Sequence, residues 1–230
     1  MMPSDRRSAL PQAEISGRIA RLQRALHDRG TGGALIVQKT DLFYFTGTSQ
    51  QGWLWVPEQG SALLMVFKDF ERARAESPLD QVVSLASPKK INEMLAEYGY
   101  GLPPTIGLEL DVLPTNLFFQ YQKIFAPAEL VDISTEIRLI RAVKSEFELE
   151  MMGRAASFSD LLSARVPELL EVGRTEITVA GELESYARSL GHQGIVRMRL
   201  WGSELFYGHL MSGPAAAVPS YLASPTGGEG

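Results

Sequence analysis

Between residues 33 and 134 the sequence alternates short apolar runs with segments of helical character, and this alternation constrains the fold more than any other feature. Runs of strand length occur at 33–38, 42–47, 62–67, 81–86, 105–110 and 128–134. Helices are expected over 69–77, after Ser87-Pro88 and after Pro114-Thr115. Strands that alternate with helices form a parallel or mixed sheet covered by helices. The sequence therefore predicts an α/β fold for this part of the chain.

A helical stripe precedes the alternation. Its apolar side chains recur every three or four residues, at Ile15, Ile19, Leu22 and Leu26. Such spacing places them on one face of a helix, and Gly30 is a residue type that ends helices. Residues 1–14 are polar and are expected to form a flexible tail. The first domain is expected to span residues 15–140, and roughly 125 residues are enough to bury a core.

The character of the sequence changes near Val143, where a long helix is predicted to begin. Ser145 and Glu148 have the spacing of a capping box, in which each side chain bonds the backbone N–H of the other residue. An apolar stripe at helical spacing follows, at Phe147, Met151, Ala155, Phe158, Leu162, Val166 and Leu169. Pro167 lies inside the stripe and predicts a kink or a break there.

A second helix and one strand are predicted behind the first helix. Thr175 is a favourable N-cap residue, and Gly191 is a favourable stop. The alternation of residues 195–202 predicts a half-buried strand with Arg197 and Arg199 on its polar face. Salt bridges on a solvated face are the favoured interpretation of these arginines, and binding of a carboxylate is the alternative.

The segment 141–230 lacks the sheet that its helices need. A two-layer unit must bury its apolar stripes, and a single strand cannot receive two long helices. Leaving five or six large apolar side chains in water forgoes about 1.5–3 kcal/mol each, and the sum approaches the stability of a whole domain. Either a partner copy covers the stripes or the natural protein is longer. The second alternative is favoured, which predicts an incomplete α+β domain.

Composition excludes several classes of function. The net charge of −5 argues against a nucleic-acid partner or an anionic membrane surface. The absence of cysteine excludes disulfides and a thiolate metal site. The longest strongly apolar run, Leu63 to Phe67, is far shorter than the ~20 residues of a membrane helix. The polar N-terminus lacks the apolar core of a signal peptide, so a cytoplasmic location is expected.

Four short motifs resemble one known family, and together they cover most of the chain. DLFYFTG (41–47) resembles the Asp-x-x-Tyr-x-Thr-Gly signature in the N-terminal domain of the creatinase/prolidase/aminopeptidase P family. IRLIRAVKSEFELEMMGRAA (137–156) resembles the junction before the catalytic domain of that family. GRTEITVAGELE (173–184) resembles a helix start in the catalytic domain, and SGPAAAVPS (212–220) resembles a loop that enters its active site.

The resemblance implies a creatinase-type N-terminal domain, with a mixed sheet flanked by helices, followed by an incomplete pita-bread α+β domain. Peptidases of this family use two divalent metal ions (Mn, Co or Zn) to cleave the bond before a proline with a metal-activated water. A homodimer and a peptide or small amide substrate are implied for the full-length protein. Creatinase shares the fold but needs no metal, so a creatinase-like amidinohydrolase is one alternative. A stand-alone module for dimerisation or interaction is another.

The metal ligands of the family follow the point where this sequence ends, so no metal site is expected in the chain itself. After Glu184 the carboxylates are Glu204 and Glu229, and there is no Asp. The chain also departs from the family in the SGPAAAVPS loop, where Ala215 replaces an Asn and Ser220 replaces a His. Because serine cannot supply the charge of imidazole, His209 is a candidate to take over that role, and an ordinary strand-end histidine is the alternative.

The remaining histidines and the paired aromatic residues carry weaker expectations. His27 is expected on the surface, and His192 is expected to have a structural role after a helix C-terminus. Tyr44 and Phe45 are expected in the core or at a domain interface, with a substrate-facing role as the alternative. The tryptophans at 53 and 55 are expected on a loop or hairpin, as a packing pair or as part of an interface or substrate wall.

Overall fold

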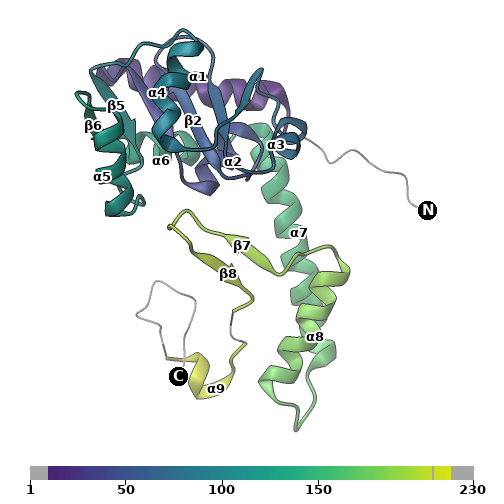
Figure 1. Ribbon diagram of the computed structural model, residues 1–230. Helices are drawn as coiled ribbons and strands as arrows, with labels where there is room; N and C mark the ends of the chain where they lie inside the picture. The colour runs from purple at the N-terminus through teal and green to yellow at the C-terminus, as the bar shows by residue number, and fades with distance from the viewer. Residues whose placement is uncertain (1–9, 209, 219–230) are drawn as a thin grey trace. The chain divides into compact units, whose positions relative to one another are not determined.

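The computed structural model describes residues 10–208 and 210–218, and its elements are shown in Figure 1. Contacts divide the chain into two compact units. The first unit contains the residues up to Lys144 together with Arg199–Trp201, and the second contains Ser145–Met198 and the residues from Gly202 onward.

The first unit holds most of the secondary structure. In chain order its elements are α1 (Gln12–Arg29), β1 (Gly33–Ile36), α2 (Lys39–Thr46), β2 (Gly52–Pro57), β3 (Leu63–Val66), α3 (Phe70–Glu76), β4 (Gln81–Ser84), the 3-10 helix η1 (Pro88–Lys90), α4 (Ile91–Glu97), β5 (Thr105–Leu108), α5 (Thr115–Ile124), β6 (Glu129–Asp132) and α6 (Ser134–Ala142). Helix α1 begins at Gln12, so three residues expected in the tail form its first turn.

One mixed sheet organises this unit. The strand order is β4-β3-β2-β1-β5-β6. Strand β2 pairs antiparallel with both β1 and β3, whereas β1 with β5, β5 with β6 and β3 with β4 pair in parallel. Strand β2 therefore runs opposite to the other five. The prediction of an α/β fold with a mixed sheet flanked by helices is confirmed.

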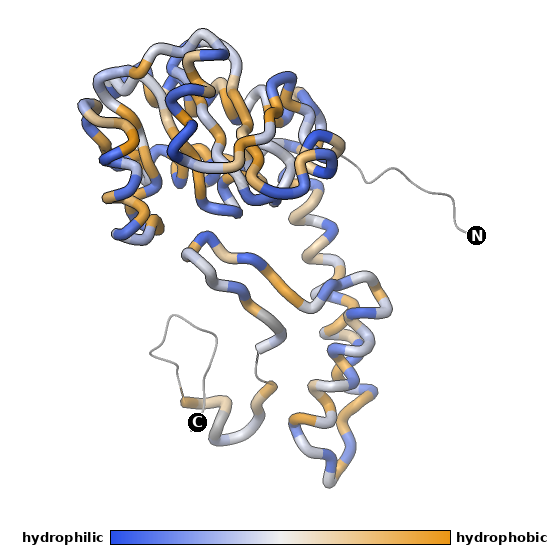
Figure 2. Tube along the Cα trace, viewed as in Figure 1, coloured by the Kyte–Doolittle hydropathy of each residue, from blue (hydrophilic) through white to orange (hydrophobic). Residues whose placement is uncertain are grey.

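The sheet has a hydrophobic core on each face. On one face, residues of β1, β2 and β3 pack with α1, α2, α3 and α6. The alternate residues of the same strands point to the other face and pack with α4 and α5. In β2, for example, Leu54 and Val56 belong to the first core, and Trp53 and Trp55 belong to the second. Figure 2 shows the strands of this unit dominated by hydrophobic residues, as expected when both faces are covered.

One prediction about local structure in this unit is wrong. The run 42–47, predicted as a strand, lies in helix α2. The side chain of Gln38 accepts hydrogen bonds from the backbone N–H groups of Thr40 and Asp41 and caps the helix, and Gly47 ends it with a φ of 78°. Trp53 and Trp55 lie in the interior strand β2, which forms an antiparallel hairpin with β3, and both pack in the second core, so the prediction of a packing pair in a hairpin is confirmed.

The second unit consists of α7 (Glu146–Leu169), α8 (Glu176–Ser189), β7 (Ile195–Arg197), β8 (Glu204–Phe206) and α9 (Gly213–Ala216). The capping box is confirmed, since Ser145 and Glu148 make both reciprocal hydrogen bonds. Helix α7 continues past Pro167 to Leu169, so the proline does not break the helix where it stands. Strands β7 and β8 pair antiparallel, and β7 is exposed over its three residues rather than half-buried.

The apolar stripes of the second unit are poorly covered. Leu169 is the one buried residue of α7 within the described structure, and Val179 and Ala187 are the buried residues of α8. Phe158 of the predicted stripe keeps 36% of its surface exposed. Figure 2 shows hydrophobic and hydrophilic residues alternating along both helices. Over the residues that the structure describes, no helix has the length and hydrophobicity needed to cross a membrane.

Candidate functional site

The two residues predicted to lie in an active site fall outside the described part of the chain. They are His209 and Ser220. Ala215, which the resemblance aligns with an asparagine, falls within the short helix α9. The catalytic expectations for the end of the sequence therefore stay predictions.

A charged cluster lies instead in the first unit, at the carboxyl ends of β1 and β5. We call it the Asp41 cluster, and its members are Asp41, Glu109, Asp111, Arg141 and Arg199. After β1 the chain adds β2, β3 and β4 on one side of this strand, and it then returns to add β5 on the other side of β1. Such a switch point is where open α/β sheets usually bind ligands.

Glu109 follows β5 directly and fastens the end of β1. Its Oε2 accepts hydrogen bonds from the backbone N–H groups of Val37, at 2.7 Å, and of Gln38, at 2.9 Å. The residue is 1% exposed. Burial raises the pKa of the Glu109 carboxyl well above its usual value, and the nearby charge of Asp41 and a hydrogen bond with it raise this pKa further, against the two backbone donors that lower it.

Asp41 stands in the first turn of α2 and is fully buried. Its Oδ1 accepts a hydrogen bond from Nη1 of Arg141 in α6 at 2.8 Å, and its Oδ2 accepts one from Nε of Arg199 at 2.7 Å. Arg199 also pairs with Asp111, and the pKa of the Asp111 carboxyl is lowered because its hydrogen bonds with Arg199 and Ser134 outweigh its partial burial. Asp41 and Asp111 are thus paired with arginines within the protein.

The residues of the DLFYFTG motif have structural roles in this arrangement. The Tyr44 ring contacts two guanidinium groups, that of Arg18 at 4.0 Å and that of Arg141 at 5.1 Å from its centre. The hydroxyl of Thr46 donates to the carbonyl of Leu42 at 2.7 Å and so closes the last turn of α2. Two motifs about 100 residues apart therefore meet through Asp41, Tyr44 and Arg141, which the sequence reasoning did not foresee.

A dinuclear metal centre does not fit the described residues. Within them, no group of three or more His, Cys, Asp or Glu side chains is arranged to hold a metal ion. In the Asp41 cluster both oxygens of Asp41 accept from arginines, and one oxygen of Glu109 is taken by two backbone donors. Arginine-paired carboxylates are poor ligands for a divalent cation, because the guanidinium charge occupies the place of the metal. We therefore derive no catalytic step through a metal in this part of the chain.

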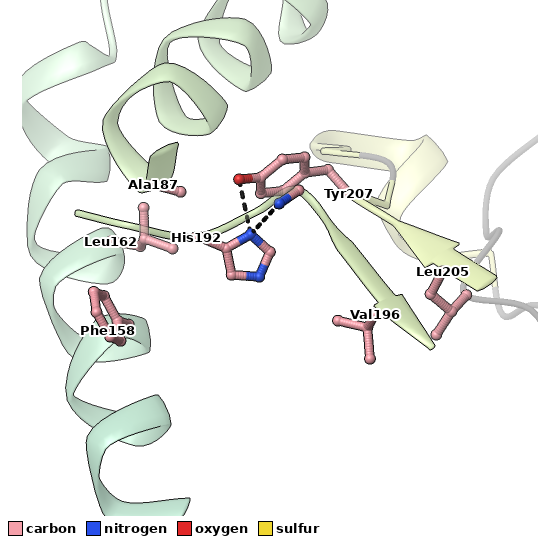
Figure 3. Close-up of a pocket in the computed structure, with 8 residues that line it drawn as sticks. Phe158, Leu162, Ala187, His192, Val196, Leu205 and Tyr207 are labelled. Atoms are coloured by element: carbon pink, nitrogen blue, oxygen red, sulfur yellow. Dashed lines mark hydrogen bonds between the residues drawn. The ribbon is translucent and has the colours of Figure 1, made fainter. Parts of the chain in front are cut away.

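The second unit contains an apolar cavity of about 240 Å³. Figure 3 shows its walls, which come from α7, α8 and the β7–β8 hairpin, with Phe158, Leu162, Val196 and Leu205 among the residues around it. Nδ1 of His192 accepts a hydrogen bond from the N–H of Gly194 at 2.9 Å and lies 3.0 Å from the hydroxyl of Tyr207. These bonds hold the imidazole in place, in keeping with the structural role expected for His192. The cavity offers apolar surface and one imidazole, which suits packing better than catalysis.

The other residues singled out in the sequence have ordinary partners. Arg197 pairs with Glu204 at 3.3 Å, so both predicted arginines form salt bridges. His27 is an exposed side chain, as expected, and its hydrogen bond with Glu58 raises its pKa. Trp53 donates from Nε1 to the hydroxyl of Tyr121 at 2.8 Å within the second core.

The comparisons with known proteins agree with this picture of the first unit. The family model described as "Creatinase/Prolidase N-terminal domain" matches residues 18–143. Among curated proteins, an uncharacterized peptidase, YqhT of Bacillus subtilis, is 24% identical over 175 residues, covering 76% of this chain and 49% of its own length. An Xaa-Pro dipeptidase of Pyrococcus furiosus is 24% identical over 212 residues, covering 90% of this chain and 56% of its own.

Solved structures show the same fold. An Xaa-Pro dipeptidase from Bacillus anthracis superposes with a TM-score of 0.70 at 22% identity, covering 79% of this chain and 52% of the other. A prolidase from Pyrococcus horikoshii gives a TM-score of 0.67 at 20% identity, with 78% and 52% covered. The chain spans about half the length of the curated relatives that it matches.

Proposed function

The chain belongs to the creatinase/prolidase N-terminal domain family, and from this membership we propose that it is the N-terminal part of a hydrolase of the Xaa-Pro peptidase class. In this proposal the first unit is a non-catalytic domain. The second unit is the beginning of a catalytic domain whose reactive groups lie elsewhere in the full-length protein.

The observation that carries the proposal is the uncovered apolar surface of the second unit. Helices α7 and α8 bury few of their large side chains, and Ile177 and Leu161 keep 79% and 46% of their surface exposed. Each such side chain gains about 1.5–3 kcal/mol when it is buried. The relatives named above are about twice as long as the part that they share with this chain, which leaves enough polypeptide for a sheet that covers these helices.

Several finer features belong to the same proposal. We expect the full-length protein to act on peptides or small amides, to use two divalent metal ions, and to work as a cytoplasmic homodimer. His209 and Ser220 are proposed to lie near the substrate, with Ser220 at the position where the family has histidine. The names of the relatives support a peptidase, and the motifs of the second half of the sequence support the placement of these two residues.

The test compares the 230-residue chain with the product of its gene read to the natural stop codon. Both are assayed on a panel of Xaa-Pro dipeptides with Mn²⁺ or Co²⁺ and after chelation, and on creatine without metal. We expect hydrolysis of Xaa-Pro dipeptides by the longer protein with metal, and none by the 230-residue chain, which should also show no submicromolar Mn²⁺ site in calorimetric titration.

Each other outcome contradicts a defined part of the proposal. Metal-dependent hydrolysis by the 230-residue chain would place the catalytic groups within it. Hydrolysis of creatine alone by the longer protein, without metal, would favour an amidinohydrolase. If the reading frame stops directly after Gly230, the peptidase proposal fails as a whole.

The uncovered helices also favour a second candidate, a stand-alone module for dimerisation or interaction. In that case a second copy covers the stripes of α7 and α8. Sedimentation equilibrium of the 230-residue chain at micromolar concentration tests this candidate. Because the first candidate is also expected to form a homodimer, the dependence of the dimer on α7 and α8 is what distinguishes the two. Replacing the exposed Ile177 and Leu161 by serine should then abolish the dimer, whereas the N-terminal part of a longer enzyme has no such requirement.

A further inference from the structure

The Asp41 cluster contains two buried carboxyl groups. Neither the fold nor the proposed function needs both of them to be ionised. Glu109 and Asp41 are exposed by 1% and 0%. They come from different elements, since Glu109 follows β5 and Asp41 lies in the first turn of α2. The two side chains are in hydrogen-bonding contact. Two carboxylates in contact out of water repel each other, and one of them usually keeps its proton.

The hydrogen bonds around the pair favour Glu109 as the residue that carries the proton. Both oxygens of Asp41 accept from arginines, at 2.8 and 2.7 Å, which favours the ionised form of this group. Oε2 of Glu109 accepts from two backbone N–H groups. Within the part of the chain that the structure describes, no donor reaches the buried Oε1 of Glu109. A buried oxygen without a donor is costly, and the cost disappears when this oxygen carries a proton and donates it to Asp41.

We propose that Glu109 and Asp41 share one proton, carried by Glu109 and donated to Asp41, and that this proton fastens helix α2 to the end of β5 as a pH-sensitive latch. Arg141 and Arg199 hold the other side of Asp41, so the latch connects β5, α2 and α6 in one chain of hydrogen bonds. Loss of the proton places two negative charges against each other at the capped N-terminus of α2.

The groups that face the pair support this assignment. The positive charges of Arg141 and Arg199 are directed to Asp41 and not to Glu109. On the α5 side, Tyr121 is the titratable neighbour, and burial, together with a smaller contribution from Glu109, raises the pKa of its hydroxyl to about 12. Asp111 is engaged by Arg199. The structure therefore gives no cation that would neutralise Glu109 in its ionised form among the residues that it describes.

The sign of the pH dependence follows from the burial of Glu109. Its pKa is raised in the folded state above the value of about 4.5 found in an unfolded chain. Between these two values the folded state holds one more proton than the unfolded state, so stability falls as the pH rises through this window. Below pH 4.5 both states are protonated at this residue, and its contribution is fully present.

Glu109→Gln is the variant that tests the latch. The glutamine oxygen can accept from the N–H groups of Val37 and Gln38, and its amide can donate to Asp41 at every pH. Glu97→Gln, in α4, is the matched control because Glu97 is exposed. Urea unfolding of the 230-residue chain is followed by tryptophan fluorescence from pH 4.5 to 9.5.

We expect the unfolding equilibrium constant of the wild type, divided by that of Glu109→Gln, to rise about tenfold per pH unit above 4.5 until Glu109 ionises in the folded state. The ratio for Glu97→Gln should stay constant. Hydrogen exchange, corrected for the intrinsic rise of the exchange rate with pH, should show a loss of protection over residues 37–46 of the wild type at alkaline pH and no such loss in Glu109→Gln.

A direct titration keeps the proposal open to refutation even if the variant fails to fold. Carboxyl ¹³C NMR of the wild type reports the ionisation of each glutamate. Glu109 should titrate well above 4.5. If Glu109 titrates near 4.5, or if the stability ratio is independent of pH, the pair does not share a proton and the proposal is overturned. A loss of Xaa-Pro hydrolysis in the longer protein would leave this result unaffected, so the two proposals fail separately.

Discussion

Replacement of Arg141 by methionine tests whether the two family motifs of the first unit are connected by a buried ion pair. Arg141 lies in α6 and binds Asp41 at 2.8 Å, and the side chain of Asp41 is completely buried. Methionine keeps much of the length and the apolar contact of the arginine stem but removes its charge. The substitution leaves a buried carboxylate with one arginine in place of two.

The expected loss follows from the burial of the two partners. Removing one side of a fully buried ion pair costs about 3–5 kcal/mol. Here the arginine side chain is 30% exposed and Arg199 still binds the other carboxylate oxygen, so we expect a smaller loss of about 2–3 kcal/mol in the free energy of unfolding. The lost contact between the guanidinium and the Tyr44 ring, at 5.1 Å, contributes part of this loss.

Arg138→Met provides a matched control on the same helix. Arg138 is 59% exposed and lies 3.9 Å from Asp111, so its removal should cost less than about 1 kcal/mol. Urea unfolding followed by tryptophan fluorescence suits both variants, because Trp53 and Trp55 are buried in the second core of the first unit. Equal midpoints for the two variants, or a loss below 1 kcal/mol for Arg141→Met, would refute the view that the motifs meet through a buried pair.

Two further predictions concern the second core and the proposed active-site loop. Tyr121→Phe removes the hydroxyl that accepts from Trp53 at 2.8 Å and leaves a buried N–H, so we expect a loss of about 1–3 kcal/mol in urea unfolding. Adding Trp53→Phe should then cost less than it does in the wild type, and strict additivity would contradict a direct hydrogen bond. In the longer protein, Ser220→His should raise kcat on Xaa-Pro dipeptides by about tenfold or more if histidine takes part in proton transfer; an unchanged rate would argue against the assigned position.

The strands and helices that were predicted correctly have clear local signals. The runs that became β1, β3, β4, β5 and β6 are short and apolar, and turn or cap residues flank them. The cap residue Ser87 and the capping box at Ser145 act through neighbours in the sequence, so the sequence alone shows them. No separate helix was predicted over residues 134–142, although Ile137 lies buried near the centre of α6.

The wrong strand at 42–47 and the absence of a separate prediction for β2 both have local causes. The run LFYF has no clear period, and its aromatic residues favour a strand. The helix is capped by the side chain of Gln38, which lies just after β1. The backbone N–H of Gln38 is in turn held by Glu109, which follows β5. Strand β2 is buried on both faces, so it lacks the alternation by which a half-buried strand is recognised.

The candidate site was the least predictable feature. Asp41 and Arg141 were each noted as part of a motif, but nothing in their spacing indicates that they form an ion pair. Glu109 was not singled out at all, although a glutamate at the end of an apolar run is the one signal that could have pointed to it. A pair formed across about 100 residues of sequence depends on the strand order, which places β5 beside β1.

Hydrophobic periodicity, caps and motifs are local in the chain, so the residues alone are enough to predict the class of fold, the family and most of the helices and strands. That residues 39–46 form a helix, and that Glu109, Asp41 and Arg141 meet, is visible only in the folded protein. Burial and hydrogen-bond partners, and not residue type alone, set the conformation of an ambiguous apolar run and the protonation of a carboxyl group. Both arise only when the sheet is assembled.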